Sequence, residues 1–253
     1  MNTLFVIPSF QRPEICRDQT LKFLERHGVE NEFIYLVLRA DDPYLNDYID
    51  RASGINILIT DVKGIGNTHN YITEFFNENQ FIVEIDDDLQ DLIDEKRIPI
   101  TNFKEIIEEM KLKMIDEKIS YGGTYQVVNP KFMSANEHYT TDLRYMLGCL
   151  RMRFIRKHIH LETNYAEDFE NCLQHFVSDG KILKNNYIAP KTKNYQKGGC
   201  DNDGRNIETE KVDKEHLANQ FPHLCRLFQR KNGRYDLRLK EYKYVGESFH
   251  SWD

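Results

Sequence analysis

The sequence predicts an α/β fold in which a mainly parallel, Rossmann-like sheet is flanked by helices. Short apolar runs alternate with amphipathic segments through the first 120 residues, and polar residues follow each apolar run. Strands that alternate with helices form mainly parallel, doubly wound sheets, and the carboxyl ends of their strands share one edge. Past residue 120 the alternation becomes irregular, so we expect a mixed second half.

Each element of this prediction comes from a local pattern. Four apolar runs predict strands in the first half, at residues 3–7, 33–38, 55–59 and 81–85. Helices are predicted at 13–27, with Gly28 as the stop, at 70–77 and at 103–117. The second half predicts strands at 121–128 and 145–155, a helix at 168–178 and a polar loop at 191–206. We expect one continuous domain with halves at 1–120 and 121–253, the second ending in a basic extension.

Composition narrows the class of protein. No stretch approaches the ~20 apolar residues that span a bilayer, and no basic flank or cleavage site precedes the first strand, so a cytoplasmic protein without a membrane span is expected. Five cysteines without a Cys-x-x-Cys pair argue against a disulfide framework and a zinc site. Residues 1–120 carry a net charge of −11 and residues 121–253 one of +4. The basic, tyrosine-containing second half favours a polynucleotide partner, although a solvated face is equally typical of such clusters.

The strand predicted at 81–85 leads directly into Asp86-Asp87-Asp88. Carboxylates crowded at the carboxyl end of a strand repel one another unless a cation neutralises them. Oxygen ligands suit Mg²⁺ or Mn²⁺, whose coordination substrate phosphates often complete. The run therefore predicts a metal at Asp86 and Asp88 and a diphosphate-bearing substrate. The alternative is the first turn of a helix that begins at Leu89, where acidic residues are also common.

Polar residues after the other strands are expected to meet these acids in one crevice. Arg12 and Lys63 are candidate cations for phosphate, and Asp41 or Asp42 is a candidate reader of base and ribose. Residues 63–67 predict a loop in which small residues let the backbone approach a ligand. Each feature alone is typical of a surface charge or a turn. Together they describe a nucleotide-diphosphate site.

Three segments resemble the nucleotide-sugar half of GT-A-fold glycosyltransferases: Val6-Ile7-Pro8-Ser9-Phe10-Gln11-Arg12-Pro13, Gly64-Ile65-Gly66-Asn67-Thr68-His69-Asn70 and Ile85-Asp86-Asp87-Asp88. In that superfamily an Asp-x-Asp motif holds Mn²⁺ or Mg²⁺ against the diphosphate of the donor, a role that the resemblance places on Asp86 and Asp88. It implies donor-binding roles for Pro8, Arg12, Asp41, Lys63, Gly64, Asn67, Asn70 and Asp87. His69 departs from the pattern, since many relatives have Arg there, and His250 is a third metal ligand only by analogy.

The second half resembles the acceptor half of family 2-like enzymes, in the order 148–155, 166–170 and 179–182. In those enzymes a Glu-Asp pair opens a helix and its Asp is the usual general base. The resemblance places this role on Asp168, with Glu167 beside it, and favours transfer with inversion. The alternative is a carboxylate stabilised by the dipole of its own helix.

A narrower resemblance concerns Tyr195-Gln196-Lys197-Gly198-Gly199 and Arg205. These residues are similar to the C-terminal part of phage and base J-type transferases that glycosylate hydroxymethylated pyrimidines in DNA. The resemblance implies that Gln196, Gly198, Gly199 and Arg205 bind the donor or close the site, whereas the residues alone also fit a turn. The expected reaction is metal-dependent transfer from a nucleoside-diphosphate sugar, with a UDP-sugar favoured, to a base that is flipped out or single-stranded. The alternatives are a glycan, lipid or protein acceptor, nucleotidyl transfer, and a non-catalytic nucleotide-binding scaffold.

Overall fold

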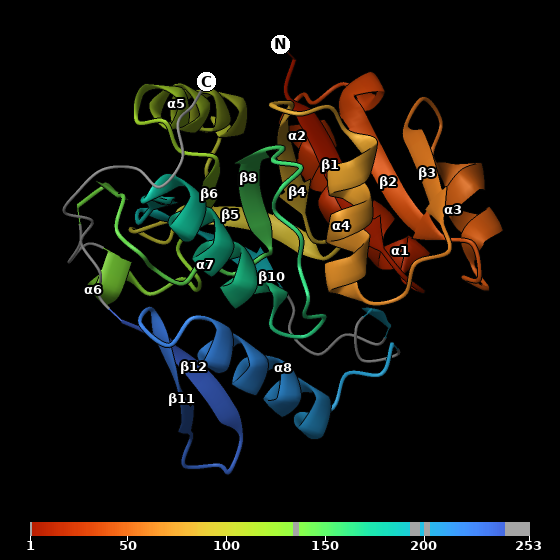
Figure 1. Cartoon of the computed structure of the whole chain (residues 1–253). Helices are drawn as coiled ribbons and strands as arrows, with labels where there is room; N and C mark the ends of the chain where they lie inside the picture. The colour runs from red at the N-terminus through yellow and green to blue at the C-terminus, as the bar shows by residue number, and fades with distance from the viewer. Residues whose placement is uncertain (1, 134–136, 193–197, 200–202, 241–253) are drawn as a thin grey trace.

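The computed structural model describes residues 2–133, 137–192, 198–199 and 203–240 (Figure 1). An eight-stranded sheet lies at its centre, in the order β3-β2-β1-β4-β8-β6-β9-β7, and two-stranded sheets pair β10 with β5 and β11 with β12. The strands are β1 (Leu4–Ser9), β2 (Ile34–Arg39), β3 (Asn56–Thr60), β4 (Phe81–Ile85), β5 (Leu89–Asp94), β6 (Tyr121–Thr124), β7 (Tyr139–Thr140), β8 (Leu150–Phe154), β9 (Leu183–Asn185), β10 (Ile188–Thr192), β11 (Cys225–Gln229) and β12 (Tyr235–Leu239).

The first half is the parallel sheet that the sequence predicts. β1 pairs in parallel with β2 and β4, and β2 pairs in parallel with β3. β8 then runs antiparallel between β4 and β6, with Ile85 opposite Leu150. The Asp86 N–H donates to the Cys149 carbonyl across 3.1 Å. This antiparallel strand makes the second half mixed and brings residues 148–151 beside the acids that follow β4.

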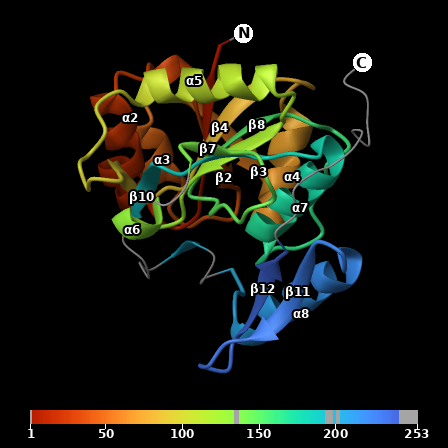
Figure 2. The same cartoon turned by 90° about the vertical axis from the view of Figure 1, so that its left-hand side faces the viewer.

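Helices cover both faces of the sheet. They are α1 (Pro13–Cys16), α2 (Lys22–Arg26), α3 (Leu45–Arg51), α4 (Ile65–Phe75), α5 (Phe103–Asp116), α6 (Pro130–Met133), α7 (Glu167–Asp179) and α8 (Ile207–Gln220), with a π-helical turn at Arg17–Leu21 and a 3-10 turn at Asn31–Phe33. Side chains alternate along β1, so that Phe5 packs with Phe103 of α5 on one face, and Val6 packs with Ile72 of α4 on the other. α4 and α7 lie together in front of the sheet in Figure 1 and on one side of it in Figure 2.

Several local predictions were wrong. Helix α4 begins at Ile65, so residues 65–67 are its first turn and not a loop. Residues 89–94 form β5, which pairs with β10, so no helix follows the acids. The predicted strands 121–128 and 145–155 are shorter than expected, at Tyr121–Thr124 and Leu150–Phe154. In each case tertiary contacts, which single-sequence patterns do not show, decide where the element begins and ends.

The C-terminal part that the sequence predicts only as a basic extension is a folded unit. Helix α8 and the hairpin β11–β12 lie together at one end of the molecule (Figures 1 and 2). Leu217, Cys225 and Leu237 of this unit share an apolar cluster with Leu173 and Phe176 of α7. The unit is therefore packed on the second half of the chain. In the described part of the chain, no helix is both long and apolar enough to cross a membrane.

Candidate active site

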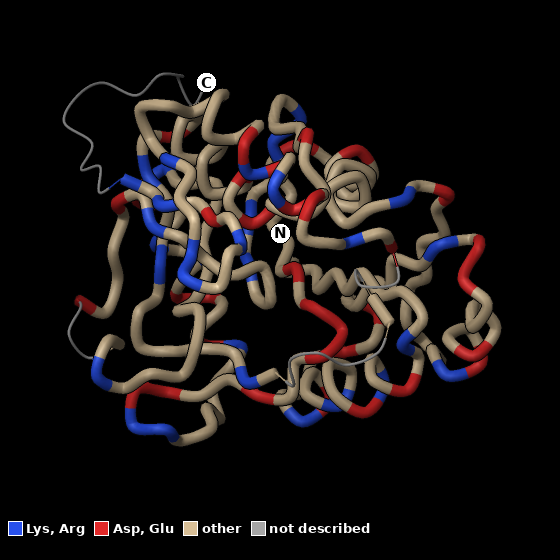
Figure 3. The backbone as a smooth tube through the Cα atoms, turned by 90° about the horizontal axis from the view of Figure 1, so that it is seen from below, with Lys and Arg blue, Asp and Glu red and all other residues tan. Residues whose placement is uncertain are grey.

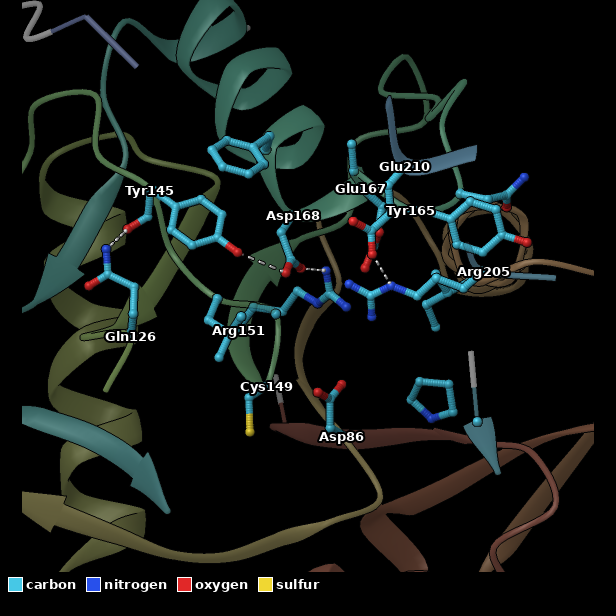
Figure 4. Close-up of a pocket in the computed structure, with 18 of the residues that line it drawn as sticks. Asp86, Gln126, Tyr145, Cys149, Arg151, Tyr165, Glu167, Asp168, Arg205 and Glu210 are labelled. Carbon is cyan, nitrogen blue, oxygen red and sulfur yellow. Dashed lines mark hydrogen bonds and ion pairs between the residues drawn. The ribbon is translucent and has the colours of Figure 1, made fainter. Parts of the chain in front are cut away.

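A cavity of about 1090 Å³ opens at the carboxyl ends of the parallel strands. Ser9, Arg39 and Thr60 line it from the ends of β1, β2 and β3, and Asp86 lines it from the end of β4. Residues of α7, α8 and the hairpin line it from the other side, as Figure 4 shows in part. The expected convergence of strand ends is therefore present, because parallel strands deliver their carboxyl ends to one edge.

The π-helical turn fixes the acidic run. The Thr20 hydroxyl donates to the Asp86 carbonyl across 2.6 Å and accepts from the Leu89 N–H across 2.9 Å. Burial, together with the Asp88 and Asp168 carboxylates and against the effect of Arg151, raises the pKa of Asp86 to about 7. A carboxylate in this position lacks sufficient neutralising charge and is stabilised by a cation beside it.

The donor set of this site suits a divalent cation. Ligand atoms of Asp86, Asp88 and Cys149 all lie within 4.8 Å of one another. The two carboxylates supply the oxygen atoms that Mg²⁺ and Mn²⁺ prefer, and the Cys149 sulfur supplies a softer neighbour. His250, the ligand suggested by analogy, lies outside the described residues. Sequence reasoning missed Cys149 as a neighbour of the candidate metal site. Cys149 approaches Asp86 and Asp88 only because β4 pairs with β8.

Arg12 lies over the acidic run. Its guanidinium contacts Asp87 across 3.2 Å and donates to the Gly198 carbonyl across 2.8 Å. Asp87 also accepts from the Ser9 hydroxyl across 2.5 Å, and burial raises the pKa of Asp87 to about 6. Asp87, which also lines the cavity, thus ties β1 to the acidic run. Pro8 and Gly199 line the cavity nearby.

Asp41 and Lys63 lie at the rim and not among the lining residues of the cavity. Hydrogen bonds from Arg39, at 2.7 and 2.8 Å, lower the pKa of Asp41 to about 2, and Lys63 contacts the same carboxylate across 3.3 Å. Arg39 itself lines the cavity, packs on the Phe10 ring at 3.9 Å and pairs with Asp203. Asp42, the other candidate reader, is buried and accepts from the Gln11 and Tyr44 N–H groups.

The glycines of α4 serve close packing within the protein. A Cβ at Gly66 would lie 1.9 Å from the Thr163 carbonyl oxygen, so the expected close approach to a ligand is instead an approach to the chain's own backbone. Gly64 lines the cavity, and its N–H donates to Asp203 across 2.8 Å. Asn70 bonds both backbone groups of Leu161 at 2.8 Å and does not line the cavity.

Asn67, another predicted residue, is not among the residues that line the cavity. Asn67 is exposed on the first turn of α4, and its side chain donates to the Lys63 carbonyl across 2.7 Å. Gln196 lies outside the described residues. Arg205 lines the cavity and donates to Glu210 across 2.8 Å.

Asp168 and Glu167 open α7 and line the cavity. The Tyr145 hydroxyl donates to Asp168 across 3.3 Å, and Arg151 Nη1 lies 3.6 Å from Asp168 Oδ1 (Figure 4). Tyr145 and Arg151 both lie outside α7, so these contacts tie the carboxylate to other parts of the fold. Burial, with the neighbouring Asp168, raises the pKa of Glu167. A Cβ at Gly148 would lie 2.2 Å from Asp168 Oδ1, so Gly148 makes room for this carboxylate.

Arg151 is a second residue that sequence reasoning missed. Its side chain is 2% exposed, lines the cavity and leaves Nε and Nη1 without a hydrogen-bond partner. Nη2 donates to His69 Nε2 across 2.6 Å, so the imidazole carries its proton on Nδ1, which donates to Glu84 across 2.7 Å. Glu84 also pairs with Arg153. A buried cation with free N–H groups therefore faces the cavity between Asp86 and Asp168 (Figure 4).

The protein has the GT-A fold of glycosyltransferases. Residues 1–349 of TarS from S. aureus, solved with UDP-GlcNAc, match 87% of this chain and 67% of that one, with a TM-score of 0.57 and 12% identity. Glucosyl-3-phosphoglycerate synthase from Mycobacterium tuberculosis, solved with Mn²⁺, UDP and phosphoglyceric acid, matches 96% of this chain and 88% of that one, with a TM-score of 0.55 and 14% identity.

Mannosyltransferase PcManGT from Pyrobaculum calidifontis, solved with GDP-Man and Mn²⁺, matches 72% of this chain and 56% of that one, with a TM-score of 0.50 and 11% identity. A longer TarS chain is matched over 40% of its length. At these identities the likeness establishes the fold. No protein-family model matches the sequence, and no curated protein matches it.

Proposed function

We propose that this protein is a metal-dependent glycosyltransferase that moves a sugar from a nucleoside-diphosphate sugar to a hydroxyl group. The observation that carries the proposal is the placement of Asp86, Asp88 and Asp168 on the walls of one cavity. Residues 1–120 supply the two acids of the donor side, and residues 121–253 supply the base of the acceptor side. The similar structures contain UDP-GlcNAc, UDP and GDP-Man, which supports this donor class, with a UDP-sugar favoured.

On the donor side, the carboxylates of Asp86 and Asp88 would hold Mn²⁺ or Mg²⁺, which would supply positive charge against the charge that grows on the departing diphosphate. Arg12, which Asp87 and the Gly198 carbonyl hold in place, shares that charge from the same side. Pro8, Gly64 and Gly199 line the cavity in which we place the donor.

On the acceptor side, Asp168 accepts the proton of the attacking hydroxyl. The oxygen of that hydroxyl forms the new bond to the anomeric carbon while the bond from this carbon to the diphosphate breaks. Tyr145 and Arg151 orient the Asp168 carboxylate, and Glu167 lines the cavity beside it. Attack from the face opposite the diphosphate inverts the anomeric configuration.

The acceptor we propose is a hydroxymethylated pyrimidine in DNA. Its support is the resemblance of residues 195–199 and Arg205 to DNA base transferases, together with an aromatic pair in the cavity. The Tyr145 and Phe169 rings stack at 4.2 Å, and both line the cavity beside Asp168. Stacking on an aromatic surface stabilises a base that has left its duplex.

The decisive experiment measures nucleoside-diphosphate release from a panel of nucleotide sugars with Mn²⁺ or Mg²⁺. Asp86→Asn/Asp88→Asn should abolish release, whereas Asp47→Asn/Asp50→Asn, which removes two exposed acids of α3, should leave it unchanged. DNA containing 5-hydroxymethylcytosine should raise release and take up the sugar. Release that survives loss of both Asp86 and Asp88 would rule out the metal site, and sugar 1-phosphate as the product would indicate nucleotidyl transfer.

Asp168→Asn separates the acceptor side from the donor side. We expect this variant to bind the donor and the metal normally and to lose transfer, because the amide cannot take the proton. Transfer at the wild-type rate would remove Asp168 from the mechanism. Transfer to a glycan, lipid or protein, with none to DNA, would keep the donor chemistry and change the acceptor.

A further inference from the structure

One face of the β11–β12 hairpin carries two arginines directly opposite each other. The register places Arg226 opposite Arg238 and Phe228 opposite Asp236. Because side chains of paired residues point to the same face and alternate along each strand, these four share one face. Leu227 and its partner Leu237 occupy the other face, where Leu237 packs in one cluster with Leu217 of α8.

Like charges directly opposite each other destabilise an antiparallel pair. In the described part of the chain, no carboxylate lies within ion-pair distance of Arg226 or Arg238. Arg238 instead packs over the Phe228 ring at 5.2 Å. Two unneutralised arginines directly opposite each other repel and destabilise the hairpin, and a bound anionic ligand would remove this repulsion.

The cavity-lining cations of this unit outnumber its acids. We call them the cationic wall, which consists of Arg205, Lys214, Arg230, Arg234 and Arg238. Two buried carboxylates, Glu210 and Asp236, line the cavity among them. The formal charge of the wall with its two acids is therefore +3, and it faces the same cavity as Asp168.

The two acids hold four of the five cations of the wall, all except Arg238. Glu210 accepts from Arg205 at 2.8 Å and from Arg234 at 3.1 and 3.2 Å. Lys214 lies 3.5 Å from Glu210 and 3.8 Å from Asp236, which also accepts from Arg230 at 2.7 Å. Cations held by buried acids lose less side-chain entropy when they bind a ligand, so this wall is preorganised for anions.

We propose that the cationic wall binds the phosphate backbone of the DNA acceptor on either side of the target base. This inference rests on the proposed function for the identity of the acceptor, and its physical basis is the excess positive charge beside Asp168. The stacked Tyr145 and Phe169 rings offer the base a surface in the same cavity, and the wall offers the adjoining phosphates fixed cations. Aromatic and cationic surfaces in one groove favour a polynucleotide over an uncharged acceptor.

The test uses fluorescence anisotropy of a labelled single-stranded oligonucleotide that contains 5-hydroxymethylcytosine, titrated with the full chain at several salt concentrations. The variants are Arg238→Gln and Arg234→Gln/Arg238→Gln. The single variant removes an exposed cation without a carboxylate partner among the described residues, so it is the safer one for folding. Arg51→Gln/Lys96→Gln removes two exposed cations that do not line the cavity and is the matched control.

A phosphate contact to single-stranded DNA contributes a slope of about −0.7 to the dependence of log K on log salt, which is about fivefold in affinity between 0.1 and 1 M salt. We expect each wall substitution to weaken binding by about fivefold near 0.1 M salt and to flatten this slope by about 0.7. The control should match the wild type in affinity and slope.

Wild-type affinity and slope in the double variant would overturn the proposal. Stronger competition by an uncharged glycan than by DNA would overturn it as well. Release of nucleoside diphosphate without acceptor, measured on the wild type, tests the proposed function separately. If the wild type cleaves no donor but its DNA binding still depends on the wall, the inference stands and the glycosyltransferase proposal fails.

Discussion

Gly148→Ala tests whether transfer depends on the position of the Asp168 carboxylate in the cavity. The added Cβ would lie 2.2 Å from Asp168 Oδ1 and 3.0 Å from Arg151 Cζ. Since ordinary contacts begin near 3.4 Å, the carboxylate must move by roughly 1 Å, because Arg151 is buried and cannot yield. A misplacement of about 1 Å can cost on the order of 100-fold in rate. We therefore expect kcat to fall by about 100-fold, with little change in donor affinity.

The assay is steady-state transfer, supported by donor binding and thermal unfolding of the same samples. Gly123→Ala is the matched control, since its Cβ would meet Met146 at 3.1 Å and no member of the proposed catalytic set. Asp168→Asn sets the scale for complete loss of the base. If Gly148→Ala is folded, binds donor and transfers at the rate of Gly123→Ala, then Asp168 need not lie where the structure places it, and the reasoning fails.

Three other substitutions test the supports of the site. Thr20→Val removes the hydroxyl that holds Asp86 and Leu89, so Mn²⁺ affinity, followed by titration, should fall, and stability to urea should fall by about 1–3 kcal/mol. Gly66→Ala should lower the free energy of unfolding by about 1–3 kcal/mol, because the clash with Thr163 outweighs the helix propensity of alanine; an unchanged urea midpoint would contradict this. Burial and Arg151 lower the pKa of His69 to about 4. As the pH falls from about 6.5 to 4, His69 therefore binds a proton in the unfolded chain before it does so in the folded protein, and the free energy of unfolding decreases over that range. His69→Gln should flatten the slope, and imidazole NMR shifts should show a neutral ring at pH 6.

The sequence allowed β4 to be predicted because this strand is buried on both faces. Phe81 to Ile85 are all buried, which is why a run that is apolar except for Glu84 marked the strand and located the acids at its end. The same reasoning could not find Arg151 and Cys149. Both depend on the antiparallel pairing of β8 with β4, which no local pattern encodes.

Several polar side chains that the sequence predicts for the donor site make hydrogen bonds within the protein. Asn70 and Asp42 satisfy backbone groups of loops, and Asp87 holds Ser9 and Arg12. A loop that lines a ligand site must have its own backbone polar groups satisfied, and short polar side chains are the usual partners. Residue type and position after a strand therefore indicate where a site lies. They do not distinguish residues that contact the ligand from residues that hold the surrounding loops in place.

A buried series of contacts runs from Glu84 through His69 and Arg151 to Asp168. It explains how the two halves of the protein hold a fixed position relative to each other. Glu84 comes from the donor-side strand β4, His69 from α4, Arg151 from β8 and Asp168 from α7, and successive members lie 2.7, 2.6 and 3.6 Å apart. Removing Arg151 would leave the Asp168 carboxylate without its cation, and unpairing a buried charge typically costs about 3–5 kcal/mol. Because a neutral His69 can bridge Arg151 and Glu84 only in one tautomer, the two hydrogen bonds of His69 have a single arrangement. That arrangement holds Arg151, and through it the carboxylate that we propose as the base, relative to the strand that precedes the proposed metal ligands.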